Sequence, residues 1–479
     1  MKKYLLHFFF SFVVLLAAIP ALAAGPIHER ASSSYYNPYS TSFTSSQNDE
    51  IEQDMQQLER LYRYVDSMYL NDIDRNAAYE AMAKALLASL EDEYSFYIGA
   101  DEASDYMDDT TGVYGGIGTY ISKPHPDSRD SSNPDALYIT IVSPFPGSPA
   151  ERAGLRSGDL ITHIDGKDVD DLSVAQASSS LKGTPGTPVT LTVKRGGNPF
   201  EVSLIREQVT TPSTTHGIID GNIGYVQISQ FVTSTAKDVE KILKDFQSKK
   251  VAGIVIDLRN NHGGLVDSAL TIADFFLPDG KTIVNLNHKN KSDDIRYIAS
   301  DGTLIPQNVP LALLINEGSA SSSEILAGAL KDNGRAILVG ETSFGKGVMQ
   351  SVTTFGNGYL QVTNARYLTP SGADIHKKGI EPDIRVEEPS FTEEEVLSYE
   401  KLMADRAIYV FVDAHPDYTE ENLQTFAQEN AESGVRKELL ILLVRNEYLA
   451  RIPYADRPIA DLKHDVTLLK AIEYIHSGQ

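Results

Sequence analysis

Four serines stand close together in the stretch NEGSASSSEILAGALKDNG. An apolar run ends near Asn316, apolar residues at helical spacing follow the serines, and Asn333-Gly334 is typical of a helix end. A hydroxyl at such a strand-to-helix turn lies near unpaired backbone N–H groups and the positive end of the helix dipole. This setting suits a nucleophile whose transition state carries an oxyanion. The candidates are Ser319, Ser321, Ser322 and Ser323.

The same serines have a purely structural interpretation. Ser321 and Glu324 have the S-x-x-E spacing of a capping box, and serine is a preferred N-cap residue without any catalytic duty. Taken alone, the stretch favours capping and does not choose among the four hydroxyls.

Lys346 lies in GETSFGKGVMQ, which matches the G-x-x-x-x-G-K part of a phosphate-binding loop. The Ser or Thr that would hold magnesium is replaced by Gly347, and the following VMQSVTTF is β-branched where a phosphate loop needs a helix. A lysine between glycines in an apolar setting can instead be desolvated, which leaves a neutral amine able to take a proton from a serine. Gln350 would lie on the same side and orient the amine. The alternative is a solvated loop lysine.

A third segment, IDLRNNHGGLV, runs from a buried strand into Gly263-Gly264. Glycines let the backbone approach a ligand closely, so this turn can complete an oxyanion hole or can be a plain turn. The histidines show no metal-ligand spacing, and there is no cysteine, which excludes thiolate catalysis and disulfides. We expect neither a metal nor another cofactor.

The patterns that must position these residues divide the chain into six stretches. We expect a signal peptide over 1–23, a linker over 24–48, an N-terminal helical region over 49–110, a strand- and glycine-rich domain over 112–206, an α/β core over 207–388 and a C-terminal helical region over 389–479. Two nearly all-apolar runs, VAGIVIDL and VPLALLIN, suit strands covered on both faces.

The net charge of the chain and its N-terminal segment limit the classes of function that are possible. With a formal net charge of -24 over 479 residues, the chain lacks the basic footprint of a nucleic-acid binder. The cationic, apolar, small-residue order of 1–23 predicts export with cleavage after Ala23, to a periplasm or cell envelope. Membrane contact is then expected only if residues 1–23 are not removed.

Together these segments resemble the carboxyl-terminal processing peptidases, also called tail-specific serine peptidases, over roughly Asp49 to Arg385. The motifs that carry the resemblance, in the family's order, are GGIG, GSPAERAGLRSGD, IGYVQISQF, IDLRNNHGG, NEGSASSSEILAGAL, VGETSFGKGVMQ and YLTPSGADI. The resemblance implies a crotonase-like spiral α/β protease core over 207–388, an inserted PDZ domain over 112–206, and flanking helical regions.

By the same resemblance, Ser321 is the nucleophile, Lys346 the general base and Gln350 the residue that positions the lysine. The oxyanion hole would take its backbone N–H groups from Ser322 and from Gly263 or Gly264. The loop that captures a substrate's terminal carboxylate would consist of Gly116, Ile117 and Gly118.

The implied function is that of an exported serine endopeptidase, which recognises the C-terminal tails of envelope proteins and hydrolyses peptide bonds with a Ser-Lys dyad. Its partners would be protein or peptide substrates with free C-termini, and an adaptor protein is a further candidate. The alternative is a non-catalytic PDZ scaffold, or pseudoprotease, that retains the fold; such a protein would be free to lose Ser321 or Lys346, and this chain has both.

Overall fold

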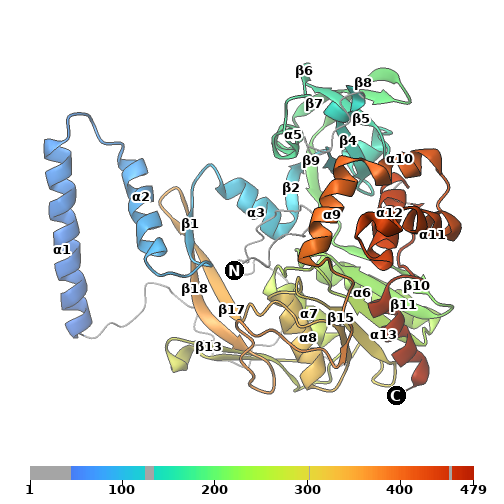
Figure 1. Cartoon of the computed structure of the whole chain (residues 1–479). Coiled ribbons are helices and arrows are strands. Elements are labelled where there is room, and N and C mark those ends of the chain that lie inside the picture. Colours follow the sequence, from blue (N-terminus) through green and yellow to red (C-terminus); the bar gives the residue numbers. More distant parts are fainter. Residues whose placement is uncertain (1–44, 124–133, 301–302, 453–455, 479) are drawn as a thin grey trace.

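In a computed structural model of the protein, we describe residues 45–123, 134–300, 303–452 and 456–478 (Figure 1). The expected signal peptide lies outside these residues, as does nearly all of the expected linker. Within them, no helix combines the length and the apolar character needed to cross a bilayer.

A six-stranded sheet forms the centre of the molecule, with strand order β10-β11-β12-β15-β16-β19. The bounds are β10 Thr214–Ile219, β11 Ile223–Ile228, β12 Gly253–Asp257, β15 Leu311–Ile315, β16 Ile337–Gly340 and β19 Ile384–Arg385. All neighbours are parallel except β10 and β11. Every residue of β12 and β15 is buried, as the two apolar runs predicted. The predicted α/β class is therefore confirmed.

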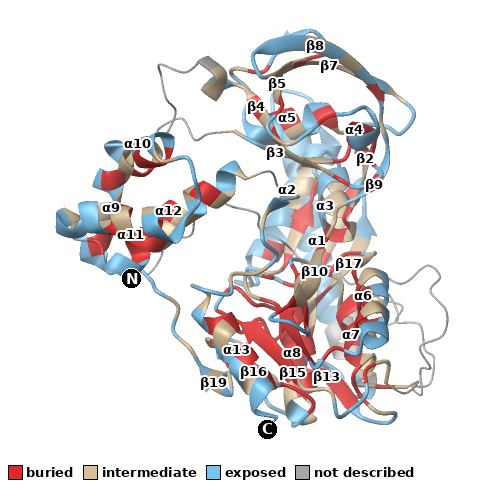
Figure 2. Ribbon diagram, turned by 90° about the vertical axis from the view of Figure 1, so that its right-hand side faces the viewer, coloured by how far each residue is buried: buried red, intermediate tan, exposed pale blue. Residues whose placement is uncertain are grey.

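Helices cover both faces of this sheet. Three of them pack with β13 on one face: α6 Thr235–Lys249, α7 Val266–Asp274 and α8 Ser322–Asp332. The other face is covered by α13, Val466–Ser477, whose Leu468, Ala471 and Ile472 pack on β11, β12 and β15. Buried residues concentrate in this sandwich (Figure 2). The last helix of the chain thus completes the core that carries the site.

A second, antiparallel sheet lies against α8 and has the order β1-β18-β13-β14, with β17 also paired to β18. Its strands are β1 Phe96–Ile98, β13 Thr282–His288, β14 Ile295–Ile298, β17 Val348–Phe355 and β18 Gly358–Leu368. Because β17 begins two residues after Lys346, the lysine enters a strand, as predicted, and no helix follows it.

The glycine-rich domain is a separate small body with its own core. Its sheet runs β3-β4-β5-β7-β8, with β6 paired to β5. Its elements are β3 Thr119–Ser122, β4 Ile139–Pro144, α4 Pro149–Arg152, β5 Leu160–Ile164, β6 Lys167–Asp168, α5 Val174–Leu181, β7 Pro188–Arg195 and β8 Asn198–Ile205. A two-stranded ribbon of β2 (Val113–Gly116) and β9 (Glu207–Thr210) joins it to the rest of the chain.

Helices flank these bodies at both ends of the chain. Near the N-terminus lie α1 Ser45–Met68, α2 Arg75–Ala88 and α3 Ala103–Thr111; α1 stands away from the body, whereas α2 packs on β1 and β18 (Figure 1). Four C-terminal helices share a core of their own: α9 Glu393–Ala404, α10 Ala407–Ala414, α11 Glu420–Glu429 and α12 Lys437–Arg451.

Candidate active site

Ser321 occupies the turn between β15 and α8 in a strained conformation. Its φ of 55° and ψ of -111° lie outside the regions that non-glycine residues ordinarily adopt. Such a residue persists only where its surroundings over-determine it, and these residues cluster at functional sites. The side chain is almost completely buried, and Ser321 and Glu324 form the capping box that the spacing predicted at the start of α8, with Ser321 Oγ as an acceptor rather than a donor.

The other three serine hydroxyls of this turn are committed to backbone carbonyls. Ser319 Oγ donates to Leu258 O, Ser322 Oγ to Gly264 O and Ser323 Oγ to Asn261 O, each at 2.8 Å. These bonds tie the start of α8 to the turn after β12. Ser321 therefore differs from its three neighbours, because its hydroxyl has no such structural bond among the described residues.

Glu324 joins the serine turn to the lysine loop. Its Oε2 accepts the backbone N–H groups of Ser321 at 2.8 Å and of Lys346 at 2.9 Å, so both residues touch one oxygen atom. Its Oε1 accepts the Gly345 N–H at 2.7 Å and the Ser343 hydroxyl at 2.6 Å. Burial raises the pKa of this carboxyl group, and the four hydrogen bonds oppose that rise. Sequence reasoning saw Glu324 only as a capping residue.

Lys346 has the environment that a neutral lysine needs. Its side chain is 5% exposed, and Nζ lies 4.5 Å from the centre of the Tyr94 ring. Burial lowers its pKa to about 8, although the carboxylates of Asp92, Glu93 and Glu324 favour the charged form. Within the described chain the amine has no hydrogen-bond or ion-pair partner, so it can accept a proton.

Tyr94 comes from the segment between α2 and β1, which sequence reasoning did not connect with the site. Gln361 Nε2 on β18 donates to Tyr94 O at 2.9 Å, and the Thr363 N–H donates to Ser95 Oγ at 2.9 Å. Tyr367 was not given a role either, although it is the first residue of the quoted YLTPSGADI. Its buried hydroxyl donates to Lys346 O and lies within hydrogen-bonding reach of the Ser321 side chain. Only spatial proximity reveals either tyrosine.

Gln350 lies on β17 and is almost completely buried. Its Nε2 donates to Thr363 Oγ1 at 3.1 Å, a partner that the sequence did not suggest. Its Oε1 is buried without a hydrogen-bond partner in the described chain, so an acceptor is free close to the lysine loop. The expected role of Gln350 in orienting Lys346 stays a prediction.

The two glycines expected at the oxyanion hole have different surroundings. The Gly263 N–H donates to Asn261 Oδ1 at 2.8 Å. Gly264, with φ of 139°, lies so close to Phe231 O that a Cβ would be 2.0 Å away, so only glycine fits. Neither the Gly264 N–H nor the Ser322 N–H has a partner among the described residues, and Ser322 Oγ holds the two segments together. Gly264 is therefore the more available of the two glycine donors.

The expected carboxylate loop lies between β2 and β3. The carbonyls of Ile117 and Gly118 accept the N–H groups of Ala150 and Phe145, at 2.9 and 3.0 Å. Their own N–H groups have no partner within the described chain, while Gly116 pairs with Glu207 as the last residue of β2. Two unpaired backbone donors next to an edge of the domain can receive a terminal carboxylate.

Comparison with known proteins places these features in a family context. The model of peptidase family S41 matches residues 222–386, and a PDZ-domain model matches residues 140–195. The first range includes Ser321, Glu324 and Lys346, and the second contains most of the glycine-rich domain.

Curated relatives cover most of both chains. A carboxy-terminal-processing protease from Bartonella bacilliformis is 37% identical over 336 residues, which are 69% of this chain and 74% of that protein. The carboxy-terminal processing protease CtpA of Bacillus subtilis is 31% identical over 403 residues, or 84% of this chain and 81% of that protein. Among solved structures, a photosystem II D1 C-terminal processing protease is 31% identical with a TM-score of 0.41, covering 68% of this chain and 86% of that one.

Proposed function

Because this chain belongs to peptidase family S41, as a serine-type peptidase of the carboxy-terminal processing group with a PDZ domain, we propose that Ser321 and Lys346 form its catalytic dyad. The strongest support for this pairing is that Glu324 Oε2 accepts the backbone N–H groups of both Ser321 and Lys346. One oxygen atom thus binds the turn that carries the proposed nucleophile and the loop that carries the lysine. The buried, unpaired amine of Lys346 and the Ser321 hydroxyl, which unlike its three neighbours donates to no backbone carbonyl among the described residues, complete the support.

In the proposed reaction, Ser321 Oγ attacks the carbonyl carbon of the scissile bond and its proton passes to the neutral Lys346 Nζ. The negative charge that develops on the carbonyl oxygen is stabilised by the backbone N–H groups of Ser322 and Gly264. When the C–N bond breaks, the Lys346 ammonium returns the proton to the leaving amine. A water molecule, deprotonated by the same lysine, then hydrolyses the Ser321 ester and regenerates the hydroxyl.

Recognition of the substrate's C-terminus is the second part of the proposal. The unpaired N–H groups of Ile117 and Gly118 support carboxylate binding, and the edge of β3 would pair with the extended tail. The substrates would thus be proteins that present a free, unstructured C-terminal end.

Peptides that differ only at their ends test this part. Hydrogen bonds to a charged group contribute about 1.5–3 kcal/mol each, so a C-terminal amide should raise KM roughly tenfold or more relative to the free acid. Extension by two aspartates should weaken cleavage likewise, because two charged side chains then replace the small apolar residues at the end of the tail. Equal kcat/KM for all three peptides would remove tail recognition and leave a protease whose specificity lies around Ser321.

We further propose that the protein is exported and acts on envelope proteins, with an adaptor as a candidate partner. The cationic start and the apolar run of residues 1–23 support export. The absence of cysteine is compatible with a location in either the periplasm or the cell envelope. N-terminal sequencing of the protein recovered from cells checks this proposal. A mature chain that begins at Ala24 agrees with it, and a chain that retains residues 1–23 contradicts cleavage.

A further inference from the structure

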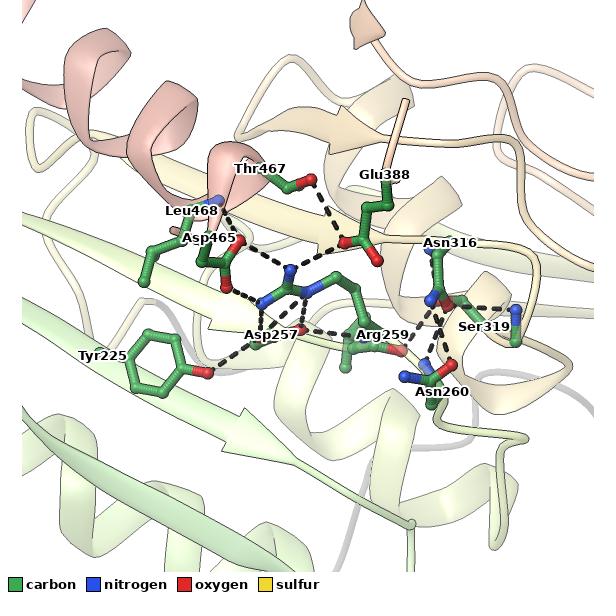
Figure 3. Close-up of polar contacts among 12 residues, drawn as sticks. Tyr225, Asp257, Arg259, Asn260, Asn316, Ser319, Glu388, Asp465, Thr467 and Leu468 are labelled. Atoms are coloured by element: carbon green, nitrogen blue, oxygen red, sulfur yellow. Dashed lines mark hydrogen bonds and ion pairs between the residues drawn. The ribbon is translucent and has the colours of Figure 1, made fainter. Parts of the chain in front are cut away.

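Arg259 lies two residues after β12 and contacts three carboxylates, two of which come from distant parts of the chain (Figure 3). Its Nε and Nη2 contact both oxygens of the fully buried Asp257, with Nη2 to Oδ2 at 2.6 Å. On its other side, Nη1 and Nη2 meet the two oxygens of Asp465 at 2.9 and 2.6 Å. Glu388 Oε1 accepts a further bond from Nη1 at 2.9 Å. The guanidinium thus contacts both carboxylate oxygens of each aspartate.

Asp465 performs two tasks at once. It is the residue before α13, and its Oδ1 accepts the Leu468 N–H at 2.9 Å as an N-cap. Because α13 is packed on the central sheet by its apolar face, the Asp465 carboxylate is held in a fixed place opposite Arg259. A residue 206 positions later in the chain therefore fixes the side chain at the end of β12.

The backbone that follows Arg259 is the turn proposed to supply the oxyanion donor. Asn260 has a φ of 59°, unusual for a residue other than glycine, and its N–H donates to Asn316 Oδ1 at 2.9 Å. Asn316 in turn is bonded to Ser319, two residues before Ser321. A turn with strained residues keeps its shape only when its ends are held. The described contacts hold it at Asn316, at the start of α8 through the Ser322 and Ser323 hydroxyls, and at Arg259, where the chain enters the turn.

We propose that Asp465 is a positioning residue of this peptidase: through Arg259 it fixes the turn of residues 260–264 and so the placement of the Gly264 N–H toward the reacting carbonyl. The inference rests on the proposed function, since it assigns Asp465 to the oxyanion hole of that site. The C-terminal segment then contributes to transition-state stabilisation without touching the substrate.

Asp465→Asn separates this role from capping. Asparagine is as good an N-cap as aspartate, so the bond to the Leu468 N–H is retained while the charged pair with Arg259 is lost. Removing an oxyanion donor outright reduces kcat by about 10²–10³-fold, so a displaced donor should cost about tenfold in kcat. KM for a peptide substrate should change less than about twofold, because the donor acts on the transition state. Affinity for a peptide aldehyde, whose adduct oxygen occupies the hole, should fall in parallel with kcat.

Asp461→Asn is the matched control. Asp461 lies in the same segment, is similarly buried in an ion pair with Arg445 at 2.7 Å, and accepts two backbone N–H groups, but it does not contact Arg259. This variant should lose a comparable amount of thermal stability and keep its kcat and its aldehyde affinity within about twofold. Equal kcat values for Asp465→Asn and Asp461→Asn would overturn the positioning role. So would a loss of kcat that is proportional, in both variants, to the fall in melting temperature.

Ser321→Ala in the same assay tests the proposed nucleophile separately, because cleavage by that variant would refute the dyad whatever the result for Asp465→Asn.

Discussion

Ser321→Ala is expected to lower the rate of peptide cleavage by at least about 10⁴-fold, because removal of a catalytic serine leaves only the contributions of binding and of the oxyanion hole. Unlike the other three serines of the turn, Ser321 does not donate its hydroxyl to a backbone carbonyl among the described residues, so the substitution should lower the melting temperature by no more than the loss of one N-cap contact. Cleavage of a tail peptide, followed by mass spectrometry, measures the loss.

Ser323→Ala is the control in the same turn. Its hydroxyl donates to Asn261 O at 2.8 Å inside the protein, so its removal should cost about 1 kcal/mol of stability while cleavage continues at a rate within a few-fold of the wild type. If Ser323→Ala were inactive and Ser321→Ala active, the nucleophile would have been assigned to the wrong serine.

Lys346→Arg is expected to reduce kcat/KM by about 10²–10⁴-fold, the usual contribution of a general base. Arginine keeps the positive charge and much of the length, but it does not lose its proton in proteins, so it cannot accept one from Ser321. Binding of the tail peptide, measured by fluorescence anisotropy in the Ser321→Ala background, should be nearly unaffected by the second substitution.

Lys377→Arg provides the comparison. Lys377 is exposed, and its N–H donates to Gly345 O at 2.7 Å, so it borders the same loop without a buried amine. This variant should retain near-wild-type turnover. Turnover of Lys346→Arg as high as that of Lys377→Arg would exclude a base role for Lys346.

The sequence predicted the local features of the site because they depend on neighbouring residues. The apolar run before Asn316 and the helical spacing after Ser321 placed the serine at a strand-to-helix turn, which the structure confirms. The β-branched residues after Gly347 likewise excluded the helix of a phosphate loop, and β17 is there instead. Local pattern was sufficient for these elements.

Contacts between distant segments could not be predicted in the same way. Glu324 was already explained by its capping spacing, and nothing local indicated that it would also accept two N–H groups from the lysine loop. Tyr94 reaches Lys346 only because β1 pairs with β18. Asp465 meets Arg259 only because α13 returns to the central sheet. In each case tertiary packing brings together residues from distant segments, and the local sequence around each residue gives no sign of its contact with the site.

The pH dependence of kcat/KM tests the central claim most directly, because it reports the ionisation of essential groups in the free enzyme. With the pKa of Lys346 lowered by burial to about 8, about one-tenth of the amine is neutral at pH 7 and about nine-tenths at pH 9. We therefore expect kcat/KM to rise about tenfold between these values and then to level off. A profile that is flat from pH 7 to 9, or that rises only below pH 7 as a histidine such as His376 would produce, would contradict a lysine base.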